Sequence, residues 1–144
     1  MKWITAEEIV NWVERKPKDA QQFLPHFVKR LIRSAGDGVR SLEMPDGDGT
    51  ADHGWDGILT FVGDSPHIPT GNSVWEIGTN KKVKPKANKD FEQRTNDPKG
   101  VTPSDTTFVF VTPRKWEKKA NWVAEKKGEV KWKDVRALNG RDLE

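Results

Sequence analysis

The first third of the chain shows hydrophobic residues at the spacing of helices. Thr5 followed by Glu8 has the form of a capping box, which predicts a helix over residues 6–16. A second helix is expected over residues 25–35, because apolar side chains recur there every three or four positions. Pro25 suits the first turn of such a helix, where its missing N–H group would have no partner in any case.

The pattern of the remaining two thirds of the chain predicts strands, with two further helices between them. Residues 36–54 are rich in Gly and Asp and are read as a loop, with a weak strand over residues 39–42. The later elements are expected as strands at 54–63, 72–79, 106–113 and 129–138, and as helices at 85–95 and 116–128. A short meander followed by a β-α-β crossover predicts an α/β fold with a mixed central sheet of about four to five strands. Helices flank that sheet, and two more lie at the N-terminus.

The composition of the chain limits which classes of protein it can belong to. The 144 residues suffice for one domain, and about a third of them are charged. No apolar run approaches the roughly 20 residues that a membrane span needs. The first residues lack the apolar core of a signal peptide, so we expect a cytoplasmic protein. The chain has no cysteine, which excludes disulfides and thiolate metal sites.

Charge is distributed unevenly, although the formal net charge is only +3. Residues 81–89 carry a basic run without any acid, and residues 42–56 carry an acidic run without any base. The basic run consists of Lys81, Lys82, Lys84, Lys86 and Lys89, and the acidic run of Glu43, Asp46, Asp48, Asp52 and Asp56. The two runs flank the first part of the predicted sheet.

Two carboxylates stand at the ends of neighbouring predicted strands. Asp56 opens one strand within GWDG, and Glu76 lies near the end of the next. If these strands are antiparallel neighbours, the two carboxylates converge at one edge of the sheet. Two carboxylates and a backbone carbonyl are ligands that Mg²⁺ accepts, and such an ion activates water against phosphorus. The plainer alternative is that GWDG is a turn and that the lysines form a solvated face.

The sequence also resembles a known superfamily. The path from GWDG through SVWEIGTNKKVKPKANKDFEQRT to TTFVFVTPRKW resembles the PD-(D/E)xK nucleases, which share the restriction-endonuclease-like fold. More narrowly, it looks like a nuclease-like domain at the N-terminus of large bacterial NTPases of phage defence. The resemblance runs from about Leu24 to the end of the chain. It implies a Mg²⁺-dependent endonuclease, with Mn²⁺ as a substitute, that cuts double-stranded DNA with little sequence specificity.

The superfamily motif can be placed on this chain residue by residue. Asp56 matches the first metal-binding aspartate, and Glu76 matches the acid of the D/E-x-K element. Ile77 would lend its carbonyl oxygen to the metal. The motif lysine should follow at position 78, and this chain has Gly78 instead. This departure puts plain catalysis in doubt.

In the superfamily the lysine can come from the following helix, and Lys86 is our candidate. Lys82 and Lys81 on the connecting loop are the runners-up. Lys86, Asp90 and Gln93 share one helix face by their spacing, so Lys86 and Gln93 are expected to look toward the carboxylates. The alternatives are an ordinary pair between Lys86 and Asp90, and a surface position for Gln93.

DNA binding is expected to rest on contacts with the phosphate backbone. Arg114 follows the most apolar strand, where it either contacts phosphate or caps the exit of the strand. The residues assigned to nucleic-acid binding are Lys81, Lys82, Lys84, Lys89, Arg94 and Arg114.

Three interpretations stay open from sequence. The first is an active endonuclease, and the second is a catalytically silent relative that binds nucleic acid or a protein partner, which Gly78 favours. The third is an unrelated α/β scaffold with incidental carboxylates. The last residues resemble the start of another helix, with Asn139 or Asp142 as its N-cap. We therefore expect residues 1–144 to be one domain, the N-terminal fragment of a longer multidomain protein that forms homo-oligomers.

Overall fold

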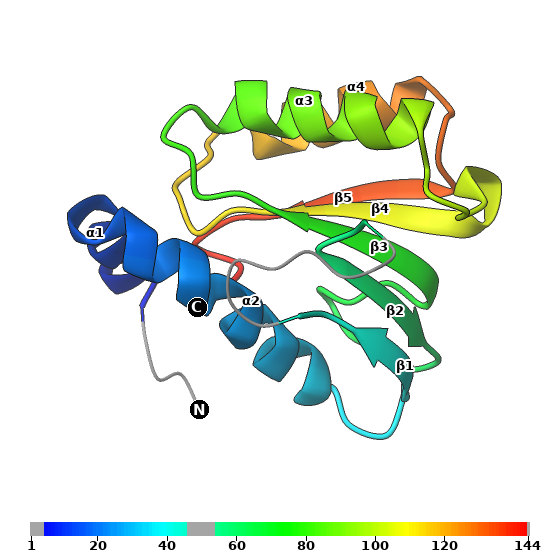
Figure 1. The fold of residues 1–144 in the computed structure, drawn as a ribbon, viewed down its shortest axis with the longest axis horizontal. Helices are drawn as coiled ribbons and strands as arrows, with labels where there is room; N and C mark the ends of the chain where they lie inside the picture. The colour runs from blue at the N-terminus through cyan, green and yellow to red at the C-terminus, as the bar shows by residue number, and fades with distance from the viewer. Residues whose placement is uncertain (1–4, 46–53, 144) are drawn as a thin grey trace.

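The computed structural model describes residues 5–45 and 54–143, and every structural statement below concerns those residues. Figure 1 shows how helices and a single sheet are arranged along the chain. The elements are α1 (Ala6–Arg15), α2 (Pro17–Arg33), β1 (Val39–Glu43), β2 (Gly57–Phe61), β3 (Gly71–Ile77), α3 (Val83–Asn96), a short 3₁₀ helix (Pro103–Asp105), β4 (Thr106–Val111), α4 (Lys119–Gly128) and β5 (Asp134–Leu138).

The sheet is mixed, as the sequence predicted. Its strands lie in the order β1-β2-β3-β4-β5. The pairs β1–β2 and β2–β3 are antiparallel, whereas β3–β4 and β4–β5 are parallel. Helix α3 makes the crossover from β3 to β4, and α4 makes the crossover from β4 to β5. The β3 strand is therefore the point where the antiparallel half of the sheet meets the parallel half.

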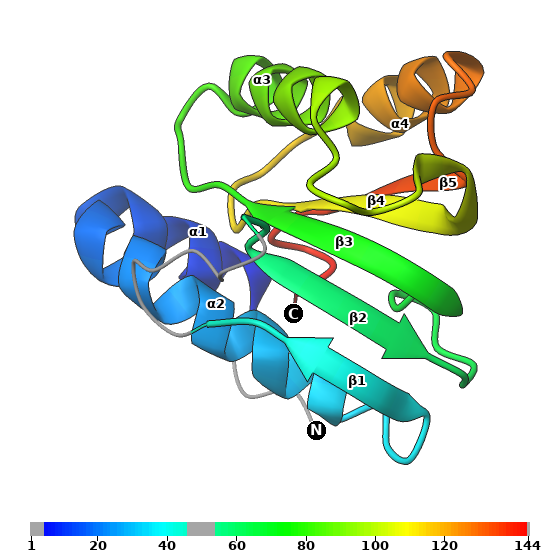
Figure 2. The same ribbon diagram turned by 45° about the vertical axis from the view of Figure 1, so that its right-hand side comes forward.

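Helices cover both faces of the sheet (Figure 1, Figure 2). Successive side chains of a strand point to opposite faces of the sheet, so the inner strands contribute residues to two hydrophobic cores, one on each face. Leu59, Phe61 and Trp75 pack with α2 on one face. Val74 and Phe108 pack with α3 and α4 on the other. The described part of the chain contains no helix long and apolar enough to span a bilayer.

The second helix corrects one prediction from sequence. Helix α2 begins at Pro17, almost directly after α1, and Pro25 lies inside it. Ala20 and Leu24 are buried on the same side as Val28, so the apolar face runs through the proline without a break. Burial of that face offsets the hydrogen bond that Pro25 removes. Tertiary packing thus overrides the preference of proline for a first turn.

The last strand is shorter than predicted. It begins at Asp134 rather than at residue 129, and Trp132 precedes it in the connection from α4. The Trp132 ring is buried, and its Nε1 donates a hydrogen bond to Thr95 Oγ1 at 2.9 Å. Trp132 therefore contributes its side chain to the core although it lies in a loop. The weak strand predicted at 39–42 is confirmed as β1. Residues 46–53 of the predicted loop, with Asp46, Asp48 and Asp52, lie outside the described residues.

Candidate functional site

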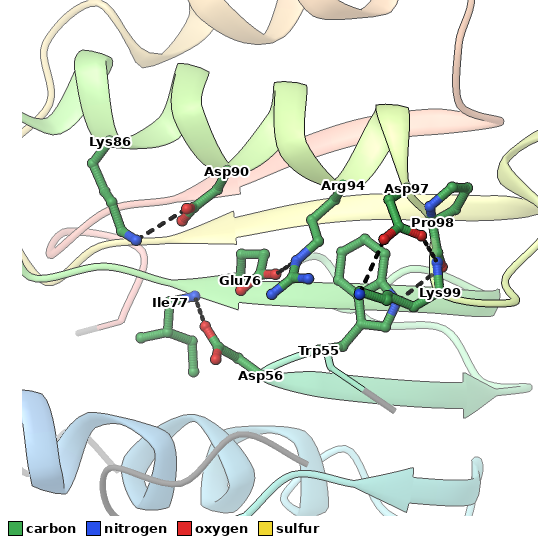
Figure 3. Close-up of polar contacts among 10 residues, drawn as sticks. All are labelled: Trp55, Asp56, Glu76, Ile77, Lys86, Asp90, Arg94, Asp97, Pro98 and Lys99. Atoms are coloured by element: carbon green, nitrogen blue, oxygen red, sulfur yellow. Dashed lines mark hydrogen bonds and ion pairs between the residues drawn. The ribbon is translucent and has the colours of Figure 1, made fainter. Parts of the chain in front are cut away.

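The antiparallel pairing of β2 and β3 brings the two carboxylates together. Gly57 pairs with Trp75, so Asp56 and Glu76 are the next residues on the two strands at the same end of the sheet. The backbone N–H of Ile77 donates a hydrogen bond to Asp56 Oδ2 at 2.8 Å. Figure 3 shows this group at the end of β3, beneath α3. The convergence predicted from the order of strands is therefore confirmed.

Burial dominates the electrostatics of Glu76, which is only 4% exposed. Loss of solvent raises its pKa, and the hydrogen bond and charge of Asp56 raise it further, to about 9. Arg94 lowers the pKa of the same carboxyl, but by less. Like charges on neighbouring carboxyl groups oppose each other, so the carboxylate of Asp56 disfavours ionisation of Glu76. A pKa of about 9 keeps Glu76 protonated at neutral pH in the absence of a metal ion.

Arg94 reaches down from α3 to this pair. Its Nε donates to Glu76 Oε1, and its guanidinium lies over the ring of Trp55 at 5.3 Å from the centroid. Glu76 points toward α3 because it lies two residues after Val74, whose side chain packs on that helix layer. The arginine that the sequence assigned to a DNA surface thus faces the carboxylate pair in the structure.

Lys86 and Asp90 occupy the preceding turns of the same helix face (Figure 3). Lys86 Nζ lies 3.0 Å from Asp90 Oδ1. Asp90 is 6% exposed, and burial raises its pKa while Lys86 lowers it. Its second oxygen, Oδ2, is buried and has no hydrogen-bond partner among the described residues. The sequence identified Asp90 only as a neighbour of Lys86, because spacing does not reveal depth of burial.

Gly78 lies directly beneath Lys86. The Gly78 N–H donates to the Val111 carbonyl at 2.9 Å, which extends the β3–β4 ladder by one bond. A Cβ atom added at Gly78 would lie 2.9 Å from Lys86 Cγ and 3.1 Å from Phe110 Cζ. The side chain of Lys86 therefore fills the space that a side chain at position 78 would occupy.

Gln93 is exposed and lies at the edge of the helix face that points to the sheet. The buried positions of α3 include Ala87, Asp90 and Phe91, so the centre of the inner face is turned away from Gln93. Lys86 lies at the same edge but reaches inward because its side chain is long. The sequence grouped Gln93 with Lys86 by spacing alone, and the rotation of α3 places Arg94 nearest Glu76 instead.

The other predicted nucleic-acid contacts divide into two groups. Lys81, Lys82, Lys84 and Lys89 are exposed on the β3–α3 connection and on α3. Arg114 is only 8% exposed, and its Nε donates to the Thr79 carbonyl at 2.9 Å, which fits the predicted alternative of a cap at the strand exit. It also lines an open groove of about 670 Å³ whose other residues are Val10, Asn11, Glu14, Lys81 and Lys115.

The donor set fits a hard divalent cation. Asp56 and Glu76 supply carboxylate oxygens, and Ile77 follows them with a backbone carbonyl. Mg²⁺ is commonly bound through one or two carboxylates, with waters completing its shell. A divalent cation at this point would favour the ionised form of Glu76 and so oppose the effect of its burial. Within residues 5–45 and 54–143 no group of three or more His, Cys, Asp or Glu side chains could hold a metal ion, so the pair would need the backbone carbonyl and waters as further ligands.

Comparison with models of protein families, with curated proteins and with solved structures gave no match to this chain. The geometry of the site therefore carries the functional argument.

Proposed function

We propose that this chain is a Mg²⁺-dependent endonuclease domain of the PD-(D/E)xK type that hydrolyses phosphodiester bonds of double-stranded DNA. The observation that carries the proposal is the meeting of half-buried Asp56 and buried Glu76 at the ends of β2 and β3, with Lys86 lying over Gly78, two residues after Glu76. Carboxyl groups that could bind a cation and a lysine that could bind a phosphate thus lie at the same end of the sheet. The parallel strands β3 and β4 end there, which is where α/β sheets commonly bind ligands.

Asp56, Glu76 and the Ile77 carbonyl would hold the ion. Bound Mg²⁺ supplies an activated water and stabilises charge on the phosphoryl group. Lys86 presents its ammonium to the non-bridging oxygens of the phosphate or to the attacking water. The runners-up Lys82 and Lys81 lie on the exposed connection just before α3, within the same basic run. Together with Lys84 and Lys89, they give the approaching DNA backbone a positive surface.

A second candidate function is a catalytically silent nuclease-like domain that binds nucleic acid or a protein. The pair between Arg94 and Glu76 favours it, because a guanidinium can neutralise a buried carboxylate in place of a metal. Gly78 favours it as well. The two functions differ in whether the carboxylate pair takes up a divalent cation.

Plasmid cleavage tests the first proposal. Wild-type protein at high concentration is incubated with supercoiled plasmid in Mg²⁺, in Mn²⁺ and in EDTA, beside Asp56→Asn, Glu76→Gln and Lys86→Ala. We expect metal-dependent nicking that each substitution reduces by at least about 100-fold. Glu92→Gln is the matched control, because Glu92 is an exposed carboxylate on α3. Nicking that survives Glu76→Gln unchanged would refute the assignment of the site.

Binding of Mn²⁺ distinguishes the two candidate functions without relying on cleavage. The endonuclease should bind Mn²⁺, detected by loss of the free-ion electron paramagnetic resonance signal, and Glu76→Gln should abolish that binding. A silent domain should bind none in the wild type. DNA affinity that depends on salt but not on metal would then support the silent domain.

We further propose that the domain is the effector of a cytoplasmic bacterial anti-phage protein that acts as a homo-oligomer. The resemblance to nuclease-like domains of phage-defence NTPases supports this extension. A fused dimerisation domain supplies the test: cleavage that rises more than about tenfold on forced dimerisation supports activation by clustering. Equal cleavage by monomer and dimer would contradict it.

A further inference from the structure

We infer that Gly78, Lys86 and Asp90 act as one unit, in which Gly78 admits the side chain of Lys86 and Asp90 holds its ammonium beside the carboxylate pair. Asp90 and Gly78 are thereby positioning residues for a candidate catalytic lysine. The inference rests on the proposed endonuclease function and deepens it. Three separate features of the structure lead to it.

The first feature is why residue 78 is a glycine. Its backbone does not require one, because Gly78 is not among the glycines with a positive φ angle. The requirement is space: an added Cβ would lie 2.9 Å from Lys86 Cγ and 3.2 Å from Lys86 Cε. Contacts under 3.0 Å force atoms to shift, and the lysine chain is the movable partner. Any larger residue at 78 would therefore push Lys86 away from the sheet.

The second feature is the buried carboxyl of Asp90. Its side chain is 9% exposed, with Oδ1 on Lys86 Nζ at 3.0 Å. Oδ2 lacks a hydrogen-bond partner within the described part of the chain, and such an orphaned oxygen costs free energy. An apolar side chain would pack there at lower cost if packing alone mattered. The contact that Asp90 does make is the one that fixes the lysine.

The third feature is the partial exposure of Lys86. Its side chain is 28% exposed, so part of the lysine side chain is in contact with solvent. An ammonium has three N–H donors, and Asp90 accepts one. In the inferred unit, we expect the remaining donors to bind a phosphate oxygen of the substrate. Of the other charged groups acting on Asp90, Asp56 raises its pKa and Arg94 lowers it, and both belong to the proposed metal and phosphate site.

Steady-state cleavage with a double-mutant cycle tests the unit. Asp90→Asn keeps the shape of the side chain but weakens its hold on the ammonium, and Gly78→Ala displaces the lysine. We expect each to lower kcat roughly 10- to 100-fold with KM changed less than about threefold, because misplacing a reacting group by about 1 Å has that effect. In a Lys86→Ala background neither substitution should reduce kcat further.

Matched controls come from the same chain. Gly128→Ala adds a Cβ at a glycine with no atom within 4 Å, and Glu92→Gln neutralises an exposed acid of α3. Both should leave kcat unchanged. Additive losses from Asp90→Asn and Lys86→Ala, or a loss that appears only in KM, would overturn the inference.

Amine labelling gives a readout that does not need cleavage. A limiting dose of an acylating reagent is followed by mass spectrometry at Lys86, with the exposed Lys84 and Lys89 of the same helix as internal references. In the wild type Lys86 should react several-fold more slowly than both. Asp90→Asn and Gly78→Ala should bring its rate up to theirs. Equal rates at the three lysines in the wild type would overturn the inference.

The two assays separate failure of the inference from failure of the proposed function. Protection of Lys86 that both substitutions abolish, in a protein that never cuts, keeps the unit as a structural device and refutes its catalytic role. Protection together with cleavage that ignores Asp90→Asn refutes the positioning role and leaves the endonuclease standing.

Discussion

At the residue scale, the candidate site is defined by a glutamate that its surroundings keep from ionising. Glu76 is surrounded by the sheet and α3, and its nearest charged neighbours are Asp56 and Arg94. One neighbour opposes the charged form and the other favours it. Burial is the largest influence on its pKa, so the balance lies with the protonated form in the absence of a cation.

This balance predicts how stability depends on pH. The pKa of Glu76 is about 9 in the folded protein against an ordinary value of 4.5, so the folded chain holds a proton that the unfolded chain releases. The contribution of protonated Glu76 to the free energy of unfolding is fully present below pH 4.5, and it is lost as the pH rises toward 9. In EDTA, the free energy of unfolding should therefore fall with pH more steeply for the wild type than for Glu76→Gln.

Urea denaturation across this pH range measures the difference. The raised pKa of Asp90 acts in the same direction, so Glu76→Gln should retain a smaller slope rather than none. Parallel curves for the wild type and Glu76→Gln would contradict the prediction. Added Mg²⁺ should stabilise the wild type most at the alkaline end, since the ion no longer competes with a proton there.

At the element scale, α2 depends on packing more than on its own sequence. Pro25 in the helix interior removes one backbone hydrogen bond, yet the helix continues for residues on either side of it. The burial of Leu24 and Val28 against the sheet offsets that loss. Periodicity located the apolar face correctly and placed the start of the helix too late.

Replacing the proline distinguishes the observed helix from the one the sequence predicted. Pro25→Ala restores the N–H group, so we expect the protein to be stabilised by about 1–3 kcal/mol, up to the helix penalty of proline. In a helix that began at residue 25 the same change would be neutral or destabilising, because proline is favoured in the first turn. Thermal and urea denaturation measure the shift, and a destabilised Pro25→Ala variant would contradict the observed helix.

Gly128→Ala is a useful companion at the end of α4. Nothing lies within 4 Å of an added Cβ there, so its effect reports helix propensity without a new contact. A small stabilisation or none is expected from it.

At the scale of the whole molecule, helices cover both faces of the sheet (Figure 1, Figure 2), and the β3–α3 connection leaves the sheet at the end where β3 and β4 finish. The exposed lysines of the β3–α3 connection, Lys81 and Lys82, follow the end of β3 at Ile77 within five residues. The connection from α4 to β5, which carries Lys131 and Lys133, is at the opposite end of the sheet (Figure 1). Removing two lysines from one end of the sheet should therefore affect DNA binding differently from removing two lysines at the other end.

Salt dependence of DNA affinity tests this asymmetry. In a Glu76→Gln background, where DNA is not cut, Lys81→Gln with Lys82→Gln should weaken binding and reduce the slope of log K against log salt by up to roughly 2. The matched pair Lys131→Gln with Lys133→Gln removes the same charge at the far end and should leave the slope unchanged. Fluorescence anisotropy with a duplex measures both, and equal effects would indicate non-specific attraction.

The sequence by itself determined the class of fold and the meeting of the carboxylates. Helical and strand periods follow from which face of an element is buried, and that information is local. The sequence predicted that Asp56 and Glu76 meet if the two strands are antiparallel neighbours, and the observed pairing of β2 with β3 meets that condition. No knowledge of side-chain packing was needed for either result.

Only the tertiary structure decided which residues of α3 face that pair. Spacing put Lys86 and Gln93 on one face, but the rotation of the helix is set by the packing of Ala87 and Phe91 against the sheet. That rotation exposes Gln93, buries Asp90 and directs Arg94 to Glu76. The space above Gly78 is likewise a property of two elements in contact, so no local pattern could have shown that Lys86 fills it.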